Sequence, residues 1–390
     1  MAEPPPQPSF TVDGNRLTML DTGKRRIEAL IALIDGAVRS VRLLYYIYAD
    51  DAAGQRVNAA LIGAAQRGVA VSLIVDGFGA SLRADRSFFK TLEEGGVHLC
   101  LFSPRWGRRY LLRNHQKLAL ADGETDAAKI IVGGFNIEDD YLGHAAKPEL
   151  IWRDLGLLVE GSAAARLTGY FDALQGWVRT PNAKLRHLNR AVTGWSEAAG
   201  PVRWLIGGPT RRLSPWAQCL RADMRAARRI DIIAGYFAPS PTILRRLDRA
   251  GRRRADVRIV TAALSDHQNA VAAARFTYHD LLRKGVRIFE YRPSKLHTKL
   301  FLVDRSVHIG SANFDMRSLF INLELMLRVE DEAFAGHVRD YVDGEVAKSE
   351  QITRALYKQR TGWGQRMRQF IAYVLLAVVD PRVSRGLNLE

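Results

Sequence analysis

The sequence carries one spaced motif twice, and this duplication restricts the fold more than any other feature. Both copies have the order H-x-K-x-x-x-x-D, and together they supply His115, Lys117, Asp122, His297, Lys299 and Asp304. Each copy runs into an apolar segment that is typical of a buried strand. In an extended chain, side chains two residues apart point to the same side, so each histidine and its lysine share one face. A repeated signature of this kind indicates a duplicated domain rather than two unrelated core strands.

A second short apolar segment follows each motif and ends in glycine and small residues. The first copy leads into Gly134 and Asn136, and the second leads into Ser311 and Asn313, with Glu324 further on. The asparagines recur at matching positions, so we expect both to serve as amide donors. Ser311 is matched by Gly134 in the other copy, so its hydroxyl is expected to be only a minor donor to a bound phosphate.

The segments before each motif repeat the same alternation of helices and strands. Helical periodicity marks residues 24–37, 57–67, 88–94, 216–229, 241–250 and 270–284. Strand-like apolar segments alternate with them at residues 41–48, 69–75, 97–102, 230–236, 257–261 and 286–291. This order predicts the α/β class, with two similar domains that each contain a mixed sheet flanked by helices.

The duplication also sets the expected domain boundaries. We predict a flexible N-terminal tail over residues 1–14, a first domain over 15–180, a linker over 181–202, a second domain over 203–350 and a C-terminal amphipathic or apolar tail over 351–390. The segment 181–202 is polar and poorly periodic, which favours a linker. The loop before the first motif is longer than its counterpart, and Trp106, Arg108 and Arg109 could line a substrate entrance or simply be solvated.

These motifs closely resemble those of the phospholipase D superfamily. The segments GSANFDMRSLFINLEL (residues 310–325) and IWRDLGLLVEG (residues 151–161) are most similar to bacterial cardiolipin synthases, of the type that lacks N-terminal transmembrane helices. The resemblance covers roughly residues 15–350. It implies two similar domains with one composite active site between them, and a phosphatidyltransferase that works through a covalent phosphohistidine.

The residue types of the motifs suit phosphodiester chemistry without a metal. Attack on phosphorus needs a nucleophile on one side and a protonated leaving oxygen on the other, and imidazole can serve either role near neutral pH. Lys117 and Lys299 would neutralise the nonbridging oxygens, where charge concentrates in the transition state. No cluster with metal-ligand spacing is visible in the sequence, so we expect no catalytic metal and no cofactor. Other histidines, including His308, are expected to be packed or surface residues.

The resemblance also implies roles for individual residues. His115 is expected to be the nucleophile and His297 the general acid and then the base, although the sequence leaves the reverse order open. Each imidazole needs a carboxylate on its far nitrogen. Within each half, that partner is expected to be Asp154 for His115 and Glu324 for His297. Asp122 and Asp304, which complete the motifs, have a structural role at least as often as a catalytic one.

Charge and composition restrict the partners. Lysine and arginine exceed the acidic residues by 16, so the natural partners are nucleic acid or an anionic membrane. Residues 369–379 form an uncharged, apolar run of about half the roughly 20 residues that span a bilayer. This run could lie in a membrane interface or pack on the domain core. The N-terminus does not resemble a signal peptide, and Cys100 and Cys219 form no disulfide pattern, which favours a cytoplasmic protein attached peripherally to the inner face of the membrane.

Three functional hypotheses follow. The leading one is a cardiolipin synthase-like transfer of a phosphatidyl group to phosphatidylglycerol, an anionic phospholipid. The alternative is hydrolysis, by a phospholipase D or by a metal-independent phosphodiesterase or nuclease of the same superfamily, although no recognised nucleic-acid module is present. A membrane-binding scaffold with a decayed site is the third, and the intact residues of both motifs argue against it.

Overall fold

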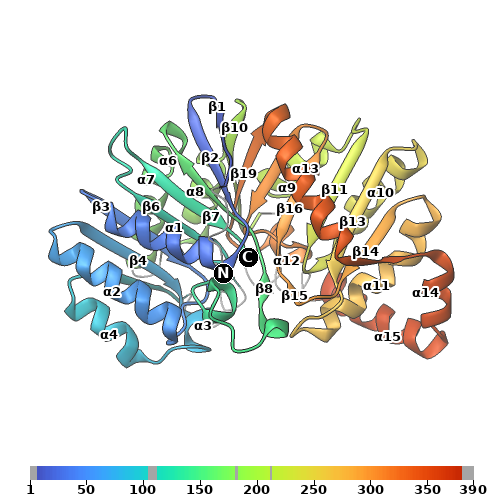
Figure 1. Cartoon of the computed structure of the whole chain (residues 1–390), viewed down its shortest axis with the longest axis horizontal. Helices are drawn as coiled ribbons and strands as arrows, with labels where there is room; N and C mark the ends of the chain where they lie inside the picture. The colour runs from blue at the N-terminus through green and yellow to red at the C-terminus, as the bar shows by residue number, and fades with distance from the viewer. Residues whose placement is uncertain (1–6, 104–111, 181–182, 211–212, 380–390) are drawn as a thin grey trace.

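The computed structural model describes residues 7–103, 112–180, 183–210 and 213–379, which form two eight-stranded sheets (Figure 1). The first sheet has the order β1 (Ser9–Val12), β2 (Asn15–Leu20), β9 (Gly156–Glu160), β7 (Lys129–Gly133), β6 (Leu118–Ala121), β3 (Ser40–Tyr45), β4 (Ala70–Asp76) and β5 (His98–Phe102). The second has the order β10 (Val202–Gly207), β19 (Glu324–Glu330), β17 (Ser306–Gly310), β16 (Lys299–Val303), β11 (Arg229–Ala234), β13 (Asp256–Ala262), β14 (Arg287–Tyr291) and β20 (Ser349–Ile352).

The two sheets share one topology, which confirms the duplicated α/β fold. In the first sheet β3, β4 and β5 are parallel, as are β11, β13 and β14 in the second. The motif strands β6 and β16 pair antiparallel with β3 and β11, and continue through β7 and β9 or through β17 and β19. Both sheets are therefore mixed, with the motif strand at the same place in each.

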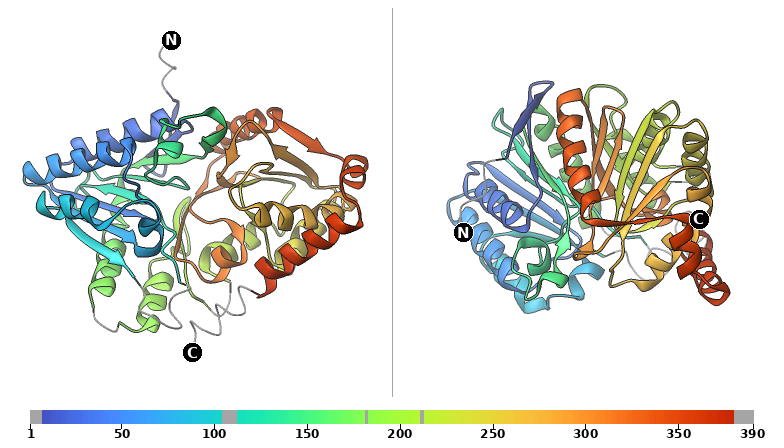
Figure 2. Two further views of the ribbon diagram at one scale, coloured as in Figure 1. Left: turned by 90° about the horizontal axis from the view of Figure 1, so that it is seen from below. Right: turned by 45° about the vertical axis from the view of Figure 1, so that its right-hand side comes forward.

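Each sheet has an outer face covered by helices of its own half (Figures 1 and 2). Helices α1 (Gly23–Asp35), α2 (Ala52–Gln66) and α4 (Arg86–Glu94) pack on the first sheet. Helices α9 (Pro215–Asp223), α10 (Pro241–Arg252) and α11 (Gln268–Arg283) pack on the second. In α1 the buried residues Ile27, Leu30 and Ile34 recur at helical spacing, and Thr22 caps the first turn by accepting from the Arg25 N–H.

The inner faces of the two sheets contribute to one shared core. Because successive strand residues face opposite sides, Leu43 packs under the outer helices while Leu44 enters this shared core. The second half contributes Leu300 and Leu325 to the same cluster. Helices α7 (Thr168–Arg179) and α13 (Glu332–Ala347) add further apolar residues. A common core fixes the two halves against each other, which a composite site requires.

Short elements complete the connections. In chain order they are α3 (Gly77–Ser81), α5 (Asp139–Leu142), the 3-10 turn η2 (Pro148–Leu150), β8 (Trp152–Arg153), α6 (Ser162–Ala165), β12 (Phe237–Ala238), β15 (Lys295–Leu296), β18 (Phe314–Asp315) and α12 (Met316–Phe320).

Two predicted boundary segments are more ordered than expected. The tail predicted over residues 1–14 is wrong from Ser9 onward, because β1 pairs with β2 around a turn at Asp13 and Gly14, both with positive φ. The linker predicted over 181–202 contains α8 (Leu185–Gly194), whose Leu188 is buried in the shared core. The C-terminal segment forms α14 (Arg354–Arg360), α15 (Trp363–Val374) and the π turn η3 (Leu375–Val379).

Candidate active site

One cavity of about 520 Å³ is lined by side chains from both halves of the chain. His115 lies just before β6 and His297 just before β16, at equivalent places in the two sheets. Both histidines line the cavity, together with Asn136 and Asn313. The two motifs therefore face one common space. Trp106, Arg108 and Arg109, considered as part of a substrate entrance, lie outside the described residues.

The histidines pair with carboxylates of the opposite half, which corrects the pairing expected within each half. His115 Nδ1 lies 3.2 Å from Glu324 Oε2, and His297 Nδ1 lies 2.6 Å from Asp154 Oδ2. Both carboxylates are fully buried. Neither is among the residues that line the cavity, so they orient the imidazoles instead of binding substrate directly.

Backbone contacts between the halves explain why the pairs are crossed. The His115 N–H donates to the carbonyl of Leu323 at 2.9 Å, which places the next residue, Glu324, beside the imidazole. The His297 N–H donates to the carbonyl of Arg153 at 2.8 Å, next to Asp154. In addition, β15 pairs in parallel with β8 across the two halves. Each motif is thus attached to the carboxylate-bearing segment of the other half.

The Ser311 hydroxyl, expected to be a minor donor to a bound phosphate, contacts the Glu324 carboxylate in the structure. Its Oγ donates to Glu324 Oε2 and accepts from the Leu325 N–H at 3.0 Å, while Ser318 Oγ donates to Glu324 Oε1 at 2.7 Å. Gly134 occupies the matching position in the first half. A Cβ atom there would lie 2.6 Å from Asp154 Oδ1, so the glycine is required by the close approach of that carboxylate.

The two lysines are buried behind the histidines. Lys117 Nζ donates to the carbonyl of His115 at 2.7 Å, and Lys299 Nζ donates to that of His297. Burial lowers the pKa of Lys117 to about 7 and that of Lys299 to about 8, although Asp154 and Glu324 act in the opposite direction. The lysines therefore lose their charge more easily than exposed lysines, and an anionic phosphate nearby would favour the charged form.

Both histidines are held in the neutral form at pH 7. Burial is the main cause, because it lowers the pKa of His115 and lowers that of His297 to about 3, with the adjacent lysine acting in the same direction. The carboxylate partner opposes this effect on each ring. A neutral imidazole that donates from Nδ1 to a carboxylate keeps a lone pair on Nε2, as a nucleophile or base requires.

The two asparagines lie on the cavity wall but are held differently. Asn136 Oδ1 accepts from the Ile47 N–H at 3.2 Å, which leaves its amide nitrogen as the group available to a ligand. The Asn313 N–H donates to Ser318 Oγ at 3.2 Å, and Asn313 Oδ1 has no hydrogen-bond partner within the described part of the chain. Their amides are therefore placed to bind an oxygen-rich group in the cavity.

Asp122 and Asp304 hold the motif strands to the sheet. Asp122 accepts from the backbone N–H groups of residues 38, 39 and 40, and Asp304 accepts from those of residues 228 and 229. Both have positive φ, at 51° and 52°, a conformation that aspartate tolerates better than most residues. Neither aspartate lines the cavity, which supports a structural role for both residues over a catalytic one.

Aromatic side chains that the sequence did not single out enclose the imidazoles. Tyr46 contacts His115 with ring centroids 5.1 Å apart, and Tyr236 contacts His297 at 5.9 Å. Each tyrosine follows the strand, β3 or β11, that pairs with the motif strand. Comparison of the two repeats in the sequence could have identified this pair, because the two tyrosines follow equivalent strands. Trp152 also packs edge-on against His297 at 5.3 Å.

Asp76 is a further site residue that the sequence did not reveal. Its Oδ2 accepts from the Asn114 N–H at 2.8 Å, and its Oδ1 accepts from the Phe78 and Gly79 N–H groups. Burial raises its pKa to about 6. Asp76 therefore positions the residue that directly precedes His115.

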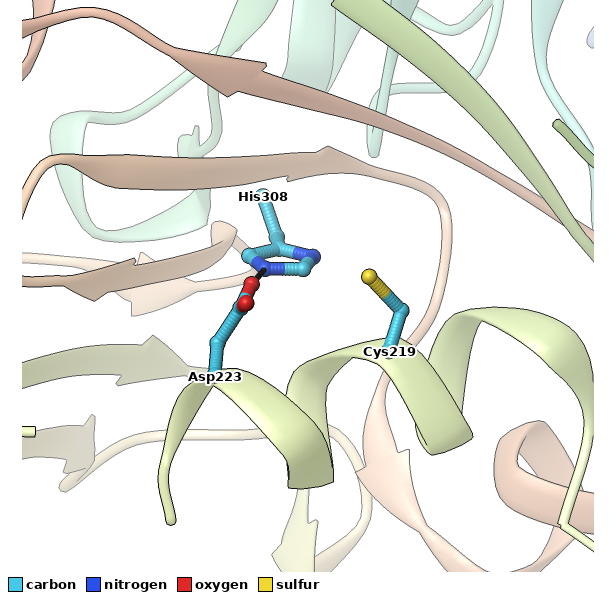
Figure 3. A group of neighbouring side chains, drawn as sticks. All are labelled: Cys219, Asp223 and His308. Carbon is cyan, nitrogen blue, oxygen red and sulfur yellow. Dashed lines mark hydrogen bonds and ion pairs between the residues drawn. The ribbon is translucent and has the colours of Figure 1, made fainter. Parts of the chain in front are cut away.

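A separate cluster brings Cys219, Asp223 and His308 together, with candidate ligand atoms within 4.8 Å of one another (Figure 3). His308 Nε2 lies 2.7 Å from Asp223 Oδ2, and Arg328 Nε donates to the same oxygen at 2.8 Å. Arg203 Nη2 donates to Cys219 Sγ at 3.3 Å. Two guanidinium groups this close would repel a divalent cation, so the cluster fits a buried ion-pair network and not a metal site.

A duplicated α/β domain with one cavity between two His–Lys pairs defines an enzyme of the phospholipase D type. A family model described as "Cardiolipin synthase, PLD-like domain" matches residues 30–174 and 221–345. The chain therefore belongs to the cardiolipin synthase family of phospholipase D-like proteins, and it is a phosphatidyltransferase of that type.

Individual relatives agree with this membership. Cardiolipin synthase A of Pseudomonas aeruginosa (strain LESB58) is 30% identical over 376 residues, which cover 94% of this chain and 74% of the relative. Cardiolipin synthase A of Pseudomonas entomophila (strain L48) is 33% identical over 349 residues, or 87% and 70% of the two chains. Among solved structures, phosphatidylserine synthase of Haemophilus influenzae Rd KW20 has a TM-score of 0.71 at 13% identity and covers 98% of this chain and 96% of that one. That likeness concerns the fold alone.

Proposed function

We propose that the enzyme makes cardiolipin from two molecules of phosphatidylglycerol. The phosphorus of the donor becomes bonded to a histidine as glycerol leaves. A hydroxyl of the second phosphatidylglycerol then displaces the histidine, so one phosphodiester is lost and one is formed. The observation that carries the proposal is the pair of buried imidazoles, one from each half, that line one cavity and are each oriented by a carboxylate of the other half.

In the first step His115 is the nucleophile. Its Nδ1–H donates to Glu324, so the Nε2 lone pair is free to attack phosphorus. The phosphohistidine carries positive charge on the ring, and the Glu324 carboxylate stabilises that charge. Ser311 and Ser318 hold the carboxylate in place through their hydroxyl groups.

His297 handles the protons of both steps. It gives the proton on Nε2 to the oxygen of the departing glycerol, and it later takes the proton of the acceptor hydroxyl. Burial lowers its pKa to about 3, so the negative charge of a bound phosphate is needed to let the ring hold that proton. Asp154, 2.6 Å from Nδ1, stabilises the protonated ring.

The lysines and asparagines stabilise the phosphate during transfer. Lys117 and Lys299 place two positive charges behind the phosphorus, where charge builds up on the nonbridging oxygens. The amides of Asn136 and Asn313 add donors from the cavity wall. These four side chains perform electrostatic work that a metal ion performs in other phosphoryl-transfer enzymes.

The lining of the cavity favours a lipid alcohol over bulk water as the acceptor. Aromatic side chains surround the histidines, among them Tyr46, Tyr141, Trp152, Tyr236 and Phe237. These rings exclude water from the space next to the phosphohistidine and offer apolar contact to a lipid backbone. Transfer and hydrolysis share the same intermediate, so this exclusion supports transfer.

The substrate places the reaction at a membrane surface. We assign the enzyme to the cytoplasmic side, attached peripherally to the inner face of the cell membrane, because its excess of 16 positive charges complements anionic lipids. Within the described part of the chain, no helix combines the length and the apolar character needed to cross a bilayer.

A product assay with labelled phosphatidylglycerol tests the proposal. Wild type and His115→Asn would be compared in detergent-mixed micelles, with cardiolipin, glycerol and phosphatidic acid measured together. Cardiolipin and glycerol in equal amounts, formed by wild type only, are the expected result. Phosphatidic acid alone would show a hydrolase, and cleavage of added DNA or RNA without lipid products would show a nuclease.

A further inference from the structure

Helix α15 carries a continuous stripe of exposed apolar side chains. Trp363, Met367, Ile371 and Leu375 follow one another every four residues, so they lie along one side of the helix. Their exposed fractions are 81%, 43%, 50% and 50%. Large apolar side chains are rarely left in such a row on a surface that stays in water.

The other side of α15 is fixed to the second half of the molecule (Figure 2). Tyr373 packs on Phe276 of α11 with ring centroids 5.1 Å apart, and its Oη donates to the carbonyl of Pro239 at 3.1 Å. Tyr357 Oη donates to Gln369 Oε1 at 3.2 Å. The helix therefore combines both expected alternatives, since one side packs on the core while the other remains exposed.

A basic cavity lies at the start of this helix. It has a volume of about 280 Å³, and four cations line it: Arg283, Arg354, Lys358 and Arg366. Its remaining lining residues include no carboxylate, and among the described residues none of these four cations forms an ion pair.

Nearby arginines outside this cavity do form ion pairs with carboxylates. Arg275 pairs with Glu290, and Arg360 pairs with Glu350. Four positive charges around one hollow repel one another, and an anion placed between them would relieve that repulsion. The size and charge of the cavity suit a phosphate group with its immediate substituents.

Helix α15 extends from the basic cavity toward the catalytic cavity. Arg366, near the start of α15, lines the basic cavity, and Leu376, just after the helix, lines the catalytic one. A helix of 12 residues is about 18 Å long. At about 100° per residue, Arg366 lies beside the stripe, so the basic cavity and the stripe adjoin, whereas Leu376 lies on the packed side of the helix with Gln369 and Tyr373.

We propose that this surface docks the enzyme on an anionic bilayer. The basic cavity binds the phosphate of a lipid headgroup that is not turned over, and the stripe enters the region between headgroups and acyl chains. Docking through the stripe and the basic cavity keeps the catalytic cavity, which Leu376 lines at the far end of the helix, within about 18 Å of the headgroup site. The inference rests on the proposed function for the identity of the substrate, but docking itself requires no catalysis.

Vesicle sedimentation tests the docking. Wild type is expected to bind equimolar phosphatidylcholine–phosphatidylglycerol vesicles and to bind pure phosphatidylcholine vesicles far more weakly. The stripe variant Met367→Ser/Ile371→Ser/Leu375→Ser should lose at least about tenfold in partitioning to anionic vesicles. The cavity variant Lys358→Gln/Arg366→Gln should lose about fivefold for each charge removed, and only on anionic vesicles.

Matched variants control for general effects of charge and hydrophobicity. Arg245→Gln/Arg249→Gln removes two charges from the exposed side of α10, and Leu82→Ser removes an exposed apolar residue in the first half. Both should bind vesicles like wild type. If the control variants lose as much vesicle binding as the stripe and cavity variants, or if the stripe and cavity variants bind like wild type, the proposed surface is wrong.

Two more measurements separate this inference from the proposed function. Glycerol phosphate in solution should not displace the protein from anionic vesicles at concentrations far above those of the lipid, and displacement would identify a site for free phosphate esters instead. With substrate dispersed in detergent, both the stripe variant and the cavity variant should keep wild-type kcat. Loss of activity there would contradict a pure docking role, whereas a wild type that binds vesicles but forms no cardiolipin would refute only the proposed reaction.

Discussion

Replacing Asp154 with asparagine tests the crossed pairing of histidines and carboxylates most directly. The carboxylate lies 2.6 Å from His297 Nδ1 and is fully buried, and asparagine keeps the shape while removing the charge. A hydrogen bond to a charged partner contributes about 1.5–3 kcal/mol, or roughly 10- to 150-fold in rate when the ring is protonated in the transition state. The equivalent change in a Ser-His-Asp triad costs about 10⁴-fold, because the tautomer is also lost. We therefore expect kcat to fall about 10²- to 10⁴-fold.

A substrate with an activated leaving group shows which histidine the carboxylate serves. With phosphatidyl-p-nitrophenol the leaving group needs no proton, so release of p-nitrophenol should be rescued in variants that impair only the general acid. If His297 is the acid, His297→Asn and Asp154→Asn should both be rescued. His115→Asn should remain inactive, and Glu324→Gln should remain slow.

The comparison is valid whichever histidine is the nucleophile, because the variant of each carboxylate must show the same rescue or lack of rescue as the variant of the histidine it contacts. If the roles were reversed, His115→Asn and Glu324→Gln would be the rescued pair. The reasoning is refuted if Asp154→Asn follows the pattern of His115→Asn, since that would restore the pairing within each half. An unchanged kcat for Asp154→Asn on phosphatidylglycerol would refute the assigned role altogether.

Three other changes test the cations, the motif aspartates and the close approach of the carboxylate. Burial lowers the pKa of Lys117 to about 7, so its charge is lost as pH rises, and kcat/KM in mixed micelles should fall on the alkaline side of that value. The variant Lys117→Arg should extend activity to higher pH, because arginine stays charged. A pH profile identical to that of wild type would contradict this role. Asp122→Ala should reduce the free energy of unfolding, measured in urea, by about 2–4 kcal/mol, and Asp304→Ala should reduce it by about 1 kcal/mol. The difference is expected because Asp122 is buried and accepts more backbone N–H groups than the exposed Asp304. Equal losses would be inconsistent with the structure. Gly134→Ala should lower kcat at least about tenfold, because its Cβ would lie 2.6 Å from a carboxylate oxygen of Asp154. The control Gly176→Ala places its Cβ in open space and should leave kcat unchanged.

The sequence predicted the repeated framework well, because period and apolarity reflect local physics. The helix expected over residues 270–284 is observed as α11 (Gln268–Arg283), and the strand expected over 257–261 is β13 (Asp256–Ala262). Errors occurred where a stronger local signal went unused. Asp13 and Gly14 form the two-residue turn of a hairpin, and Asp-Gly between alternating residues favours such a turn.

The crossing of the site could not be read from the sequence, because it depends on how the two halves dock. Asp154 follows the first motif and Glu324 follows the second, so spacing alone suggests pairing within each half. The hydrogen bonds from the N–H groups of His115 and His297 to the opposite half reverse this order. No periodicity within one domain encodes a contact of that kind.

Crossing also makes catalysis depend on the docked state of the two halves. In an isolated half, each histidine would lose the carboxylate that orients it, and each buried carboxylate would lose the groups that balance its charge. Burial by itself would raise the pKa of Asp154, but Lys299 and the hydrogen bond to His297, both from the other half, bring it below its ordinary value, and Arg26 of its own half adds to this effect. Groups of the second half therefore stabilise the ionised form of Asp154 at its buried position. The same contacts that complete the site thus stabilise the interface, so a half that failed to dock would have a hydrated carboxylate and no oriented histidine.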